Sequence, residues 1–370
     1  MKPKILIIDN SNALTGAFKS IWNYSQLLNN SYEFHYCLPK GSMVLRIIEG
    51  HNVPNLSLLF IEIGKNWKVF FYLPQLVINT LKLKRYCKMN QIKIVHINDL
   101  YNMTGVLLKI CSDVKVVYHL RLLPSSYINK TYKIWVKIIS RYADELIAVS
   151  QAAVAGAKQY SARNIKLLYD TVGSISPREI VKFPNDVVQF LYPSNYTLGK
   201  GQQYAIQAMA KVIAVNPNVY LTFVGSTFNR KGNCKFKEQL QNQIDVLKLA
   251  AFINLGEFES RLSERICKSD VVLNFSESES FSMVCLEALS YGTALIASDS
   301  GGPAELFEDK ISGILVPNKD VEKMAEAMLL LAANQNLRIK MEQAGQIFVQ
   351  KKFDVQLLAS KLDEIYKGLL

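Results

Sequence analysis

Residues 276–292 read SESESFSMVCLEALSYG and follow a short apolar run, residues 271–275, that is typical of a buried strand. Serines favour the start of a helix, the middle of the stretch is helix-forming, and Gly292 provides a helix end. The sequence therefore predicts a strand, a polar loop and a helix. Because ligands of parallel sheets bind beyond the carboxyl ends of the strands, this loop is a candidate site.

Two glutamates stand eight residues apart in this stretch, Glu279 in the loop and Glu287 about two turns into the expected helix. An ionised carboxylate can accept two hydrogen bonds from the vicinal hydroxyls of a ribose or a sugar. The backbone N–H groups of Ser282, Met283 and Val284 begin the helix, where they and the helix dipole can hold a phosphate. The stretch thus predicts binding of hydroxyls and of phosphate in one place.

Two further loops of the second half fit the same site. Residues 298–305, SDSGGPAE, contain paired glycines that would let backbone amides approach a ligand. Residues 198–201, LGKG, follow a strand and open a helix, which places Lys200 where a diphosphate would lie. Either loop alone is weak evidence, because paired glycines and capping serines occur in most α/β proteins.

The whole chain alternates short β-branched runs with longer amphipathic segments, which predicts βα units on parallel sheets. Its 370 residues suit two domains. The expected strands are 5–8, 33–37, 94–97, 115–119 and 145–149 in the first half, and 188–192, 220–224, 252–254, 271–275 and 294–297 in the second. We expect a first domain at 1–172, a linker at 173–186 around two prolines, a second domain at 187–345 and a closing amphipathic helix at 346–370.

Other features of the sequence disfavour several classes of protein. Residues 9–16, DNSNALTG, follow the first strand without the three-glycine fingerprint of many dehydrogenases, so an NAD enzyme is disfavoured. Gly16 could let a helix start approach a ligand closely, or it could merely ease a turn. The longest apolar stretch, 69–81, is interrupted and too short to span a membrane. Six scattered cysteines fit neither a zinc site nor a disulfide scaffold, which favours a cytoplasmic location.

Positive charge is concentrated in the first half of the chain. Residues 1–172 hold 22 lysines and arginines against nine acids, which leaves 21 against 22 in the remainder. The segment from Lys65 to Lys93 carries seven basic residues among aromatic residues and leucines, and Glu62 is the one acid near it. This composition is typical of a surface that meets anionic lipid, but it fits a solvated helix face above core aromatics equally well. Nucleic acid is a weaker alternative, because no recognised binding motif accompanies the charge.

The order of these motifs resembles glycosyltransferase family 4, the retaining GT-B enzymes of lipopolysaccharide, capsule and glycolipid assembly. The most specific part runs from Glu279 to Glu287. It is followed by Ala288, Gly292, the 298–302 run with Glu305, residues 313–317 and Asp320. Looser matches in the first half are Gly16-Ala17, Val95-His96, Tyr118-His119 and residues 148–150.

The resemblance implies a GT-B fold, in which two Rossmann-like domains face each other across a cleft and the closing helix returns to the first domain. It also implies a role for each motif residue. Glu287 would hold the nucleotide ribose, Glu279 the hydroxyls of the donor sugar, and Lys200 the diphosphate. Backbone amides of Ser282, Met283 and Val284 would also bind the diphosphate, and Gly16, Phe281 and Glu257 would lie in the donor site. His119 would reach across the cleft towards the sugar, although a structural role is the usual one for a lone histidine.

Two departures from the family pattern stand out. The family pairs its phosphate lysine with an arginine five residues earlier, where this chain has Asn195. Arg230 or Lys231, in the loop after the strand at 220–224, could supply the missing cation. The glycines that usually follow the first glutamate are Ser280 and Ser282 here, a change that would stiffen the loop.

The activity that the resemblance implies is transfer of a sugar, with retained anomeric configuration, from a nucleotide-sugar donor, with UDP expected, to a glycan or glycolipid acceptor. No Asp-x-Asp motif is present, so a reaction without a metal or other cofactor is expected. A cytoplasmic enzyme at the inner face of the membrane fits this activity. Two alternatives stay open: a degenerate GT-B subunit that binds or scaffolds, and a GT-B nucleotide-sugar epimerase that needs no acceptor.

Overall fold

The computed structural model describes residues 2–61, 70–126, 129–173 and 187–370. The chain forms two compact units, Met1–Gly173 with Val355–Leu370, and Ser174–Asp354. The predicted linker after Gly173, and residues 65–69 of the basic segment, lie outside the described residues. Within the described ranges, no helix is long and apolar enough to cross a membrane.

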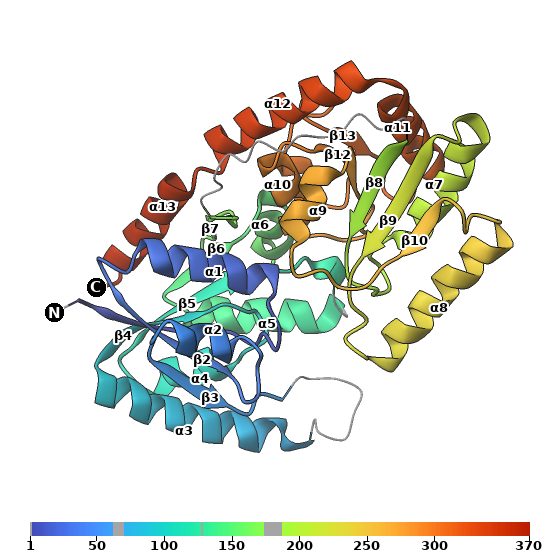
Figure 1. Ribbon diagram of the computed structural model, residues 1–370. Coiled ribbons are helices and arrows are strands. Elements are labelled where there is room, and N and C mark those ends of the chain that lie inside the picture. The colour runs from blue at the N-terminus through green and yellow to red at the C-terminus, as the bar shows by residue number, and fades with distance from the viewer. Residues whose placement is uncertain (1, 62–69, 127–128, 174–186) are drawn as a thin grey trace. The chain divides into compact units, whose positions relative to one another are not determined.

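The first unit contains a parallel sheet with the strand order β3-β2-β1-β4-β5-β6-β7. Figure 1 labels each of these strands except β1. Its strands are β1 (Lys4–Ile8), β2 (Glu33–Pro39), β3 (Asn55–Leu58), β4 (Ile92–Ile97), β5 (Lys115–Leu120), β6 (Glu145–Ala148) and β7 (Lys166–Leu167). Its helices are α1 (Gly16–Leu27), α2 (Leu45–Gly50), α3 (Tyr72–Asn90), α4 (Thr104–Cys111), α5 (Asn129–Tyr142), α6 (Gln151–Lys158) and α13 (Val355–Lys367). Helix α4 packs against both α3 and α5, and α1 packs on α13. Fully buried β-branched residues in the central strands explain why this sheet is covered by helices.

The second unit contains a parallel sheet with the order β10-β9-β8-β11-β12-β13. Its strands are β8 (Val188–Pro193), β9 (Val219–Val224), β10 (Ile253–Leu255), β11 (Val271–Asn274), β12 (Ala294–Ser298) and β13 (Ile314–Val316). Its helices are α7 (Gln202–Val215), α8 (Lys231–Val246), α9 (Leu262–Lys268), α10 (Met283–Ser290), α11 (Val321–Ala333) and α12 (Gln335–Lys352). One core joins α7, α8 and α11 to the sheet, and Phe190, Phe223 and Phe275 are among its buried members. Helix α10 packs against α9 and α12, and α10 and α12 both pack on β12.

The predicted fold class, α/β with two parallel sheets, is confirmed, and all ten predicted strands are present within two residues of their expected ends. The prediction of one closing helix at 346–370 is wrong. Helix α12 ends at Lys352 in the second unit, and α13 begins at Val355 in the first unit. The break is stabilised at Phe353, whose N–H donates to the carbonyl oxygen of Val349 and whose ring packs on Phe281.

Strand order identifies one position in each sheet where a ligand is favoured. In each sheet the chain first adds strands on one side of the first strand and then on its other side. The direction in which strands are added therefore reverses between β1 and β4 and between β8 and β11. Loops that leave the carboxyl ends of two such strands diverge, and ligands of open α/β sheets bind there. In the second unit these are the loops that carry Lys200 and Glu279.

Candidate functional site

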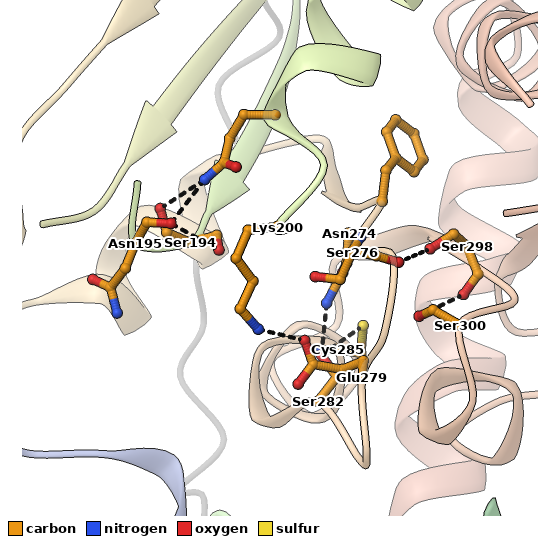
Figure 2. A network of polar contacts seen from close by, with 12 residues as sticks. Ser194, Asn195, Lys200, Asn274, Ser276, Glu279, Ser282, Cys285, Ser298 and Ser300 are labelled. Atoms are coloured by element: carbon orange, nitrogen blue, oxygen red, sulfur yellow. Dashed lines mark hydrogen bonds and ion pairs between the residues drawn. The ribbon is translucent and has the colours of Figure 1, made fainter. Parts of the chain in front are cut away.

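Lys200 and Glu279 meet at the switch point of the second unit. Lys200 lies in the loop between β8 and α7, and Glu279 lies in the loop between β11 and α10. The Nζ atom of Lys200 donates to Oε2 of Glu279 at 2.8 Å, as Figure 2 shows. The side chains keep 36% and 18% of their surface exposed, respectively, so both can still reach a ligand. The negative charge of Glu279 raises the pKa of Lys200 and keeps the lysine charged.

The main chain at Lys200 is fastened to the end of β11. The Tyr192 hydroxyl donates to the carbonyl oxygen of Lys200 at 2.6 Å and accepts the N–H of Phe275 at 2.7 Å. The N–H of Glu277 donates to the carbonyl oxygen of Gly199 at 2.9 Å. Gly201 has a φ of 78°, and a Cβ atom there would lie 1.9 Å from the carbonyl oxygen of Phe275. Only glycine allows this approach.

The main chain at Glu279 is held by the next loop of the sheet. Its N–H donates to the carbonyl oxygen of Ser300 at 3.0 Å, and its carbonyl oxygen accepts the N–H of Gly302 at 2.8 Å. The two loops that the sequence placed in one site are therefore hydrogen-bonded to each other. Ser298 joins them again through its hydroxyl, which donates to the carbonyl oxygen of Ser276 (Figure 2).

The start of α10 presents backbone donors at this edge. Ser282 caps the helix, and its hydroxyl oxygen accepts from the Cys285 N–H and the Asn274 amide, as Figure 2 shows for the latter. The N–H groups of Met283 and Val284 have no hydrogen-bond partner within the described part of the chain. Such donors, with the dipole of the helix, form a site for an anion. Binding of a diphosphate by these two amides stays a prediction.

Glu287 lies on the same helix, one turn after Met283 rather than two, because the helix begins only after its cap at Ser282. Its side chain is partly exposed. Residues three or four positions apart in a helix are neighbours on one face. Glu287 is four residues after Met283 and three after Val284, so it lies over the turn that carries the two unpartnered amides.

Asn195, which stands where the family has an arginine, forms a hydrogen bond that joins two loops. The side-chain oxygen of Asn195 accepts the N–H of Ser226 at 3.1 Å, and this bond joins the loop after β8 to the loop after β9. Asn195 supplies no charge. Arg230 and Lys231 follow in that second loop and at the start of α8, both exposed, and neither side chain has a partner among the described residues.

Two other predicted donor-site residues have different surroundings. Phe281 is buried, with its ring centroid 5.9 Å from that of Phe353, so its side chain serves packing. Glu257 is 80% exposed and forms an ion pair with Lys237 of α8. No hydrogen bond or ion pair in the described structure joins Glu257 to Lys200 or Glu279.

His119 and Gly16 lie in the first unit. The His119 side chain is fully buried in β5, and its predicted role towards the sugar stays a prediction. Its Nδ1 accepts from the Arg121 guanidinium at 3.3 Å, and its ring lies 5.4 Å from that of His96. Burial, with Arg121 beside it, lowers the pKa of His119 well below its usual value and keeps the ring neutral. Gly16 opens α1, which Thr15 caps.

A buried polar network at the strand ends of the first unit was missed by sequence reasoning. Arg121 donates through Nε to the Asn98 side-chain oxygen at 2.7 Å and through Nη1 to Asp170, and Asn98 donates to Asp9. All four side chains are at most 8% exposed. Asp9, Asn98 and Arg121 each directly follow a strand, a signal that could have identified them. Tyr192 gave no such signal, because an aromatic residue inside a strand reads as core.

Comparison with known proteins agrees with this geometry. Residues 176–348 match the family model described as glycosyl transferases group 1. A GDP-mannose-dependent monoacylated alpha-(1-6)-phosphatidylinositol monomannoside mannosyltransferase of Corynebacterium glutamicum is 30% identical over 179 residues, which cover 46% of this chain and 44% of that protein. An uncharacterized 41.2 kDa protein in the cps region of Klebsiella pneumoniae is 23% identical over 84% of this chain and 87% of that protein. The matches span about half the length of several curated relatives.

Solved structures share the fold of the whole chain. The crystal structure of Anabaena HepE in complex with UDP and glucose matches 99% of this chain and 100% of that chain with a TM-score of 0.84, at 20% identity. The predicted GT-B fold is thereby confirmed.

Proposed function

We propose that this chain, whose residues 176–348 belong to the glycosyl transferases group 1 family, is a retaining glycosyltransferase that moves a sugar from a UDP-sugar to a glycan or lipid-linked glycan acceptor. The observation that carries the proposal is the meeting of Lys200, Glu279 and the start of α10 at the switch point of the second sheet. A cation, a carboxylate and unpartnered amides match the phosphates and hydroxyls of a sugar diphosphate.

Each group has a role in this proposal. Lys200 and the N–H groups of Met283 and Val284 bind the diphosphate, Glu279 accepts hydrogen bonds from the sugar, and Glu287 accepts them from the ribose. The bond between the anomeric carbon and the β-phosphate oxygen breaks, and the acceptor oxygen bonds to that carbon on the same face. The acceptor proton passes to the departing diphosphate. Charge that develops on the phosphate oxygens is stabilised by the same lysine and amides.

This stabilisation uses cations and amides of the chain, so we propose that the reaction needs no metal ion. Activity should then be unchanged after treatment with EDTA. A complete loss that added Mg²⁺ restores would contradict the proposal. A metal-dependent enzyme binds its diphosphate through the ion, and in that case Lys200 would be a secondary contact.

The proposed donor and pathway rest on similarity to known proteins. HepE was solved in complex with UDP and glucose, which supports a UDP-sugar as the first donor to test. The Klebsiella relative is named for its location in a cps region, which supports a role in cell-surface polysaccharide synthesis. The mannosyltransferase relative is named as GDP-mannose-dependent, so GDP is the next base to test.

We also propose that α3 brings the enzyme to an anionic membrane, where a lipid-linked acceptor would be found. One face of this helix carries Leu73, Val77 and Leu81, which are 50–68% exposed. The same face continues with exposed basic side chains at Lys84, Arg85 and Lys88. Apolar residues beside cations on one helix face are what an interfacial helix presents to anionic lipid.

A thermal-shift panel of UDP, GDP, ADP, CMP and common nucleotide sugars tests the donor site first. A ligand at 100 times its dissociation constant stabilises the folded protein by about 2.7 kcal/mol. We expect one base to raise the melting temperature, and Glu287→Ala to abolish that shift. Glu322→Ala, which removes an exposed carboxylate of α11, is the matched control and should behave like the wild type.

Two outcomes would favour the alternatives. No shift with any ligand would make Asn195 a disabling change and favour a subunit that only binds or scaffolds. Conversion of a nucleotide sugar to its epimer without an acceptor would favour an epimerase. Transfer to an added acceptor, with nucleotide binding that depends on Glu287, would establish the proposed activity.

A further inference from the structure

The two side chains assigned to opposite ends of the donor's sugar diphosphate are bonded to each other. Lys200 is assigned to the diphosphate and Glu279 to the sugar hydroxyls, and their 2.8 Å ion pair is the contact that Figure 2 shows between the two loops. Each side chain must give up this partner when it binds its part of the donor. The ion pair therefore competes with the ligand, and the extent of competition depends on which ligand enters.

We infer that the Lys200–Glu279 ion pair makes the site discriminate between a nucleotide sugar and the free nucleoside diphosphate that transfer leaves behind. This inference rests on the proposed function. A nucleotide sugar compensates both side chains, because it offers a phosphate to Lys200 and hydroxyls to Glu279. A nucleoside diphosphate compensates Lys200 alone. It takes the cation from Glu279, and its free terminal phosphate adds a negative charge close to the carboxylate.

Glu279 has little freedom to avoid this penalty. Its main chain is held on both sides by Ser300 and Gly302, and only 18% of its side chain is exposed. In the described structure, Lys200 is its one ion-pair partner, and Lys319 pairs with Glu277 of the same loop. A carboxylate that is mostly buried and loses its only cation is destabilised. The free diphosphate is thus bound less tightly than its own contacts would allow.

Lys200, in contrast, can exchange partners by side-chain rotation alone. Its main chain is fixed by the Tyr192 hydroxyl and by the close approach of Gly201 to Phe275. The ammonium group is at the end of four flexible methylenes. Partner exchange therefore needs no movement of either loop.

Titration calorimetry with UDP and UDP-glucose on three proteins tests the inference. The proteins are the wild type, Glu279→Gln, and Glu277→Gln as a matched control that removes the same charge from the same loop but from a carboxylate paired with Lys319. We expect Glu279→Gln to bind UDP two- to fivefold more tightly, which is roughly the worth of a partly exposed ion pair. It should bind UDP-glucose about tenfold more weakly, because a charge-assisted hydrogen bond to the sugar is lost. Glu277→Gln should change the two affinities by the same factor or not at all.

The outcomes separate this inference from the proposed function. If the wild type binds UDP and UDP-glucose but Glu279→Gln weakens both equally, the inference is wrong and the proposed donor site stands. The inference is also overturned if Glu277→Gln tightens UDP as much as Glu279→Gln does, because a general loss of negative charge would then explain the result. If the wild type binds neither ligand, the proposed UDP-sugar donor falls, and the inference falls with it. Equal melting temperatures of the three proteins would show that all are folded.

Discussion

Single residues determine how much positive charge the proposed diphosphate site holds. Asn195 is neutral, and its side-chain oxygen accepts the N–H of Ser226. A second cation beside Lys200 must therefore come from another residue. Arg230 and Lys231 are exposed, and their loop is joined to Asn195 by that hydrogen bond. We expect Arg230→Ala or Lys231→Ala to lower UDP affinity about tenfold, the value of one charge-assisted hydrogen bond.

Calorimetric titration measures this effect, and Lys211→Ala is its control. Lys211 is an exposed lysine of α7 whose ion pair with Glu322 involves no proposed donor-site residue. Its replacement should leave UDP affinity unchanged. Unchanged affinity in both Arg230→Ala and Lys231→Ala would remove the hypothesis of a substitute cation from this loop.

The buried histidine pair makes a prediction about pH. Burial, with Arg121 nearby, lowers the pKa of His96 to about 3, and its Nδ1 is hydrogen-bonded to the Tyr366 hydroxyl at 2.7 Å. Below pH 6.5 the unfolded chain binds a proton that folded His96 does not, so the free energy of unfolding falls with acidification. The loss should approach about 1.4 kcal/mol per pH unit between pH 6.5 and 3.

Urea unfolding at pH 7.5, 6.0 and 5.0 tests this slope. His96→Gln cannot titrate but keeps a polar group for Tyr366, and it should show a smaller loss of stability over the same range. His119 still contributes in that variant, because its pKa is also lowered. Parallel pH profiles of the wild type and His96→Gln would show that His96 is not buried as a neutral group.

Residue types at strand ends were a good guide to this site, whereas contacts between distant residues were not. Lys200 and Glu279 were predicted separately, each from its own loop. Their ion pair joins positions 79 residues apart, and no local pattern encodes such a contact. The ion pair of Arg121 with Asp170 was missed for the same reason, because it joins positions 49 residues apart.

At the scale of elements, the junction of the Lys200 loop with the end of β11 predicts a contrast between two glycines. Gly199 and Gly201 both have positive φ, 89° and 78°. A Cβ at Gly199 would meet nothing within 4 Å, but at Gly201 it would meet the Phe275 carbonyl oxygen at 1.9 Å. Gly199→Ala should lose only the strain of the left-handed backbone, about 1–2 kcal/mol. Gly201→Ala should lose more stability and also UDP binding, because the two loops must separate.

Thermal unfolding with and without UDP measures both quantities. Gly199→Ala is the matched control, since it adds the same methyl group two residues away. Equal melting temperatures for the two variants would mean that the loop moves away from Phe275 freely. In that case the close approach would not position Lys200.

The elements that sequence analysis missed are those with weak signals. Strands β3, β7 and β13 have two to four residues, too few to show a periodic pattern. The break between α12 and α13 falls at Phe353 and Asp354, where neither glycine nor proline marks a helix end. The central strands were found because they are continuous runs of β-branched residues, which burial on both faces requires.

At the scale of the whole molecule, charge and chemistry are divided between the halves of the chain. Residues 1–172 carry 22 lysines and arginines against nine acids, while Lys200, Glu279 and Glu287 belong to the second unit. A chain that binds an anionic acceptor or membrane with its first unit and a nucleotide sugar with its second would have this division. The sequence predicted the division of charge because net charge is a property of composition and can be counted without knowledge of the fold.

Membrane binding through α3 is the prediction that follows for the whole molecule. We expect the protein to sediment with vesicles that contain phosphatidylglycerol but not with pure phosphatidylcholine vesicles, and to be released by high salt. Replacement of Leu73, Val77 and Leu81 by serine should weaken binding at least tenfold, because each exposed apolar side chain contributes about 1–2 kcal/mol when buried in lipid. Val246→Ser with Ile347→Ser, which removes exposed apolar residues from α8 and α12, is the control and should bind like the wild type. Binding to neither kind of vesicle, or binding that survives the α3 substitutions, would leave the exposed face of α3 as an ordinary solvated surface.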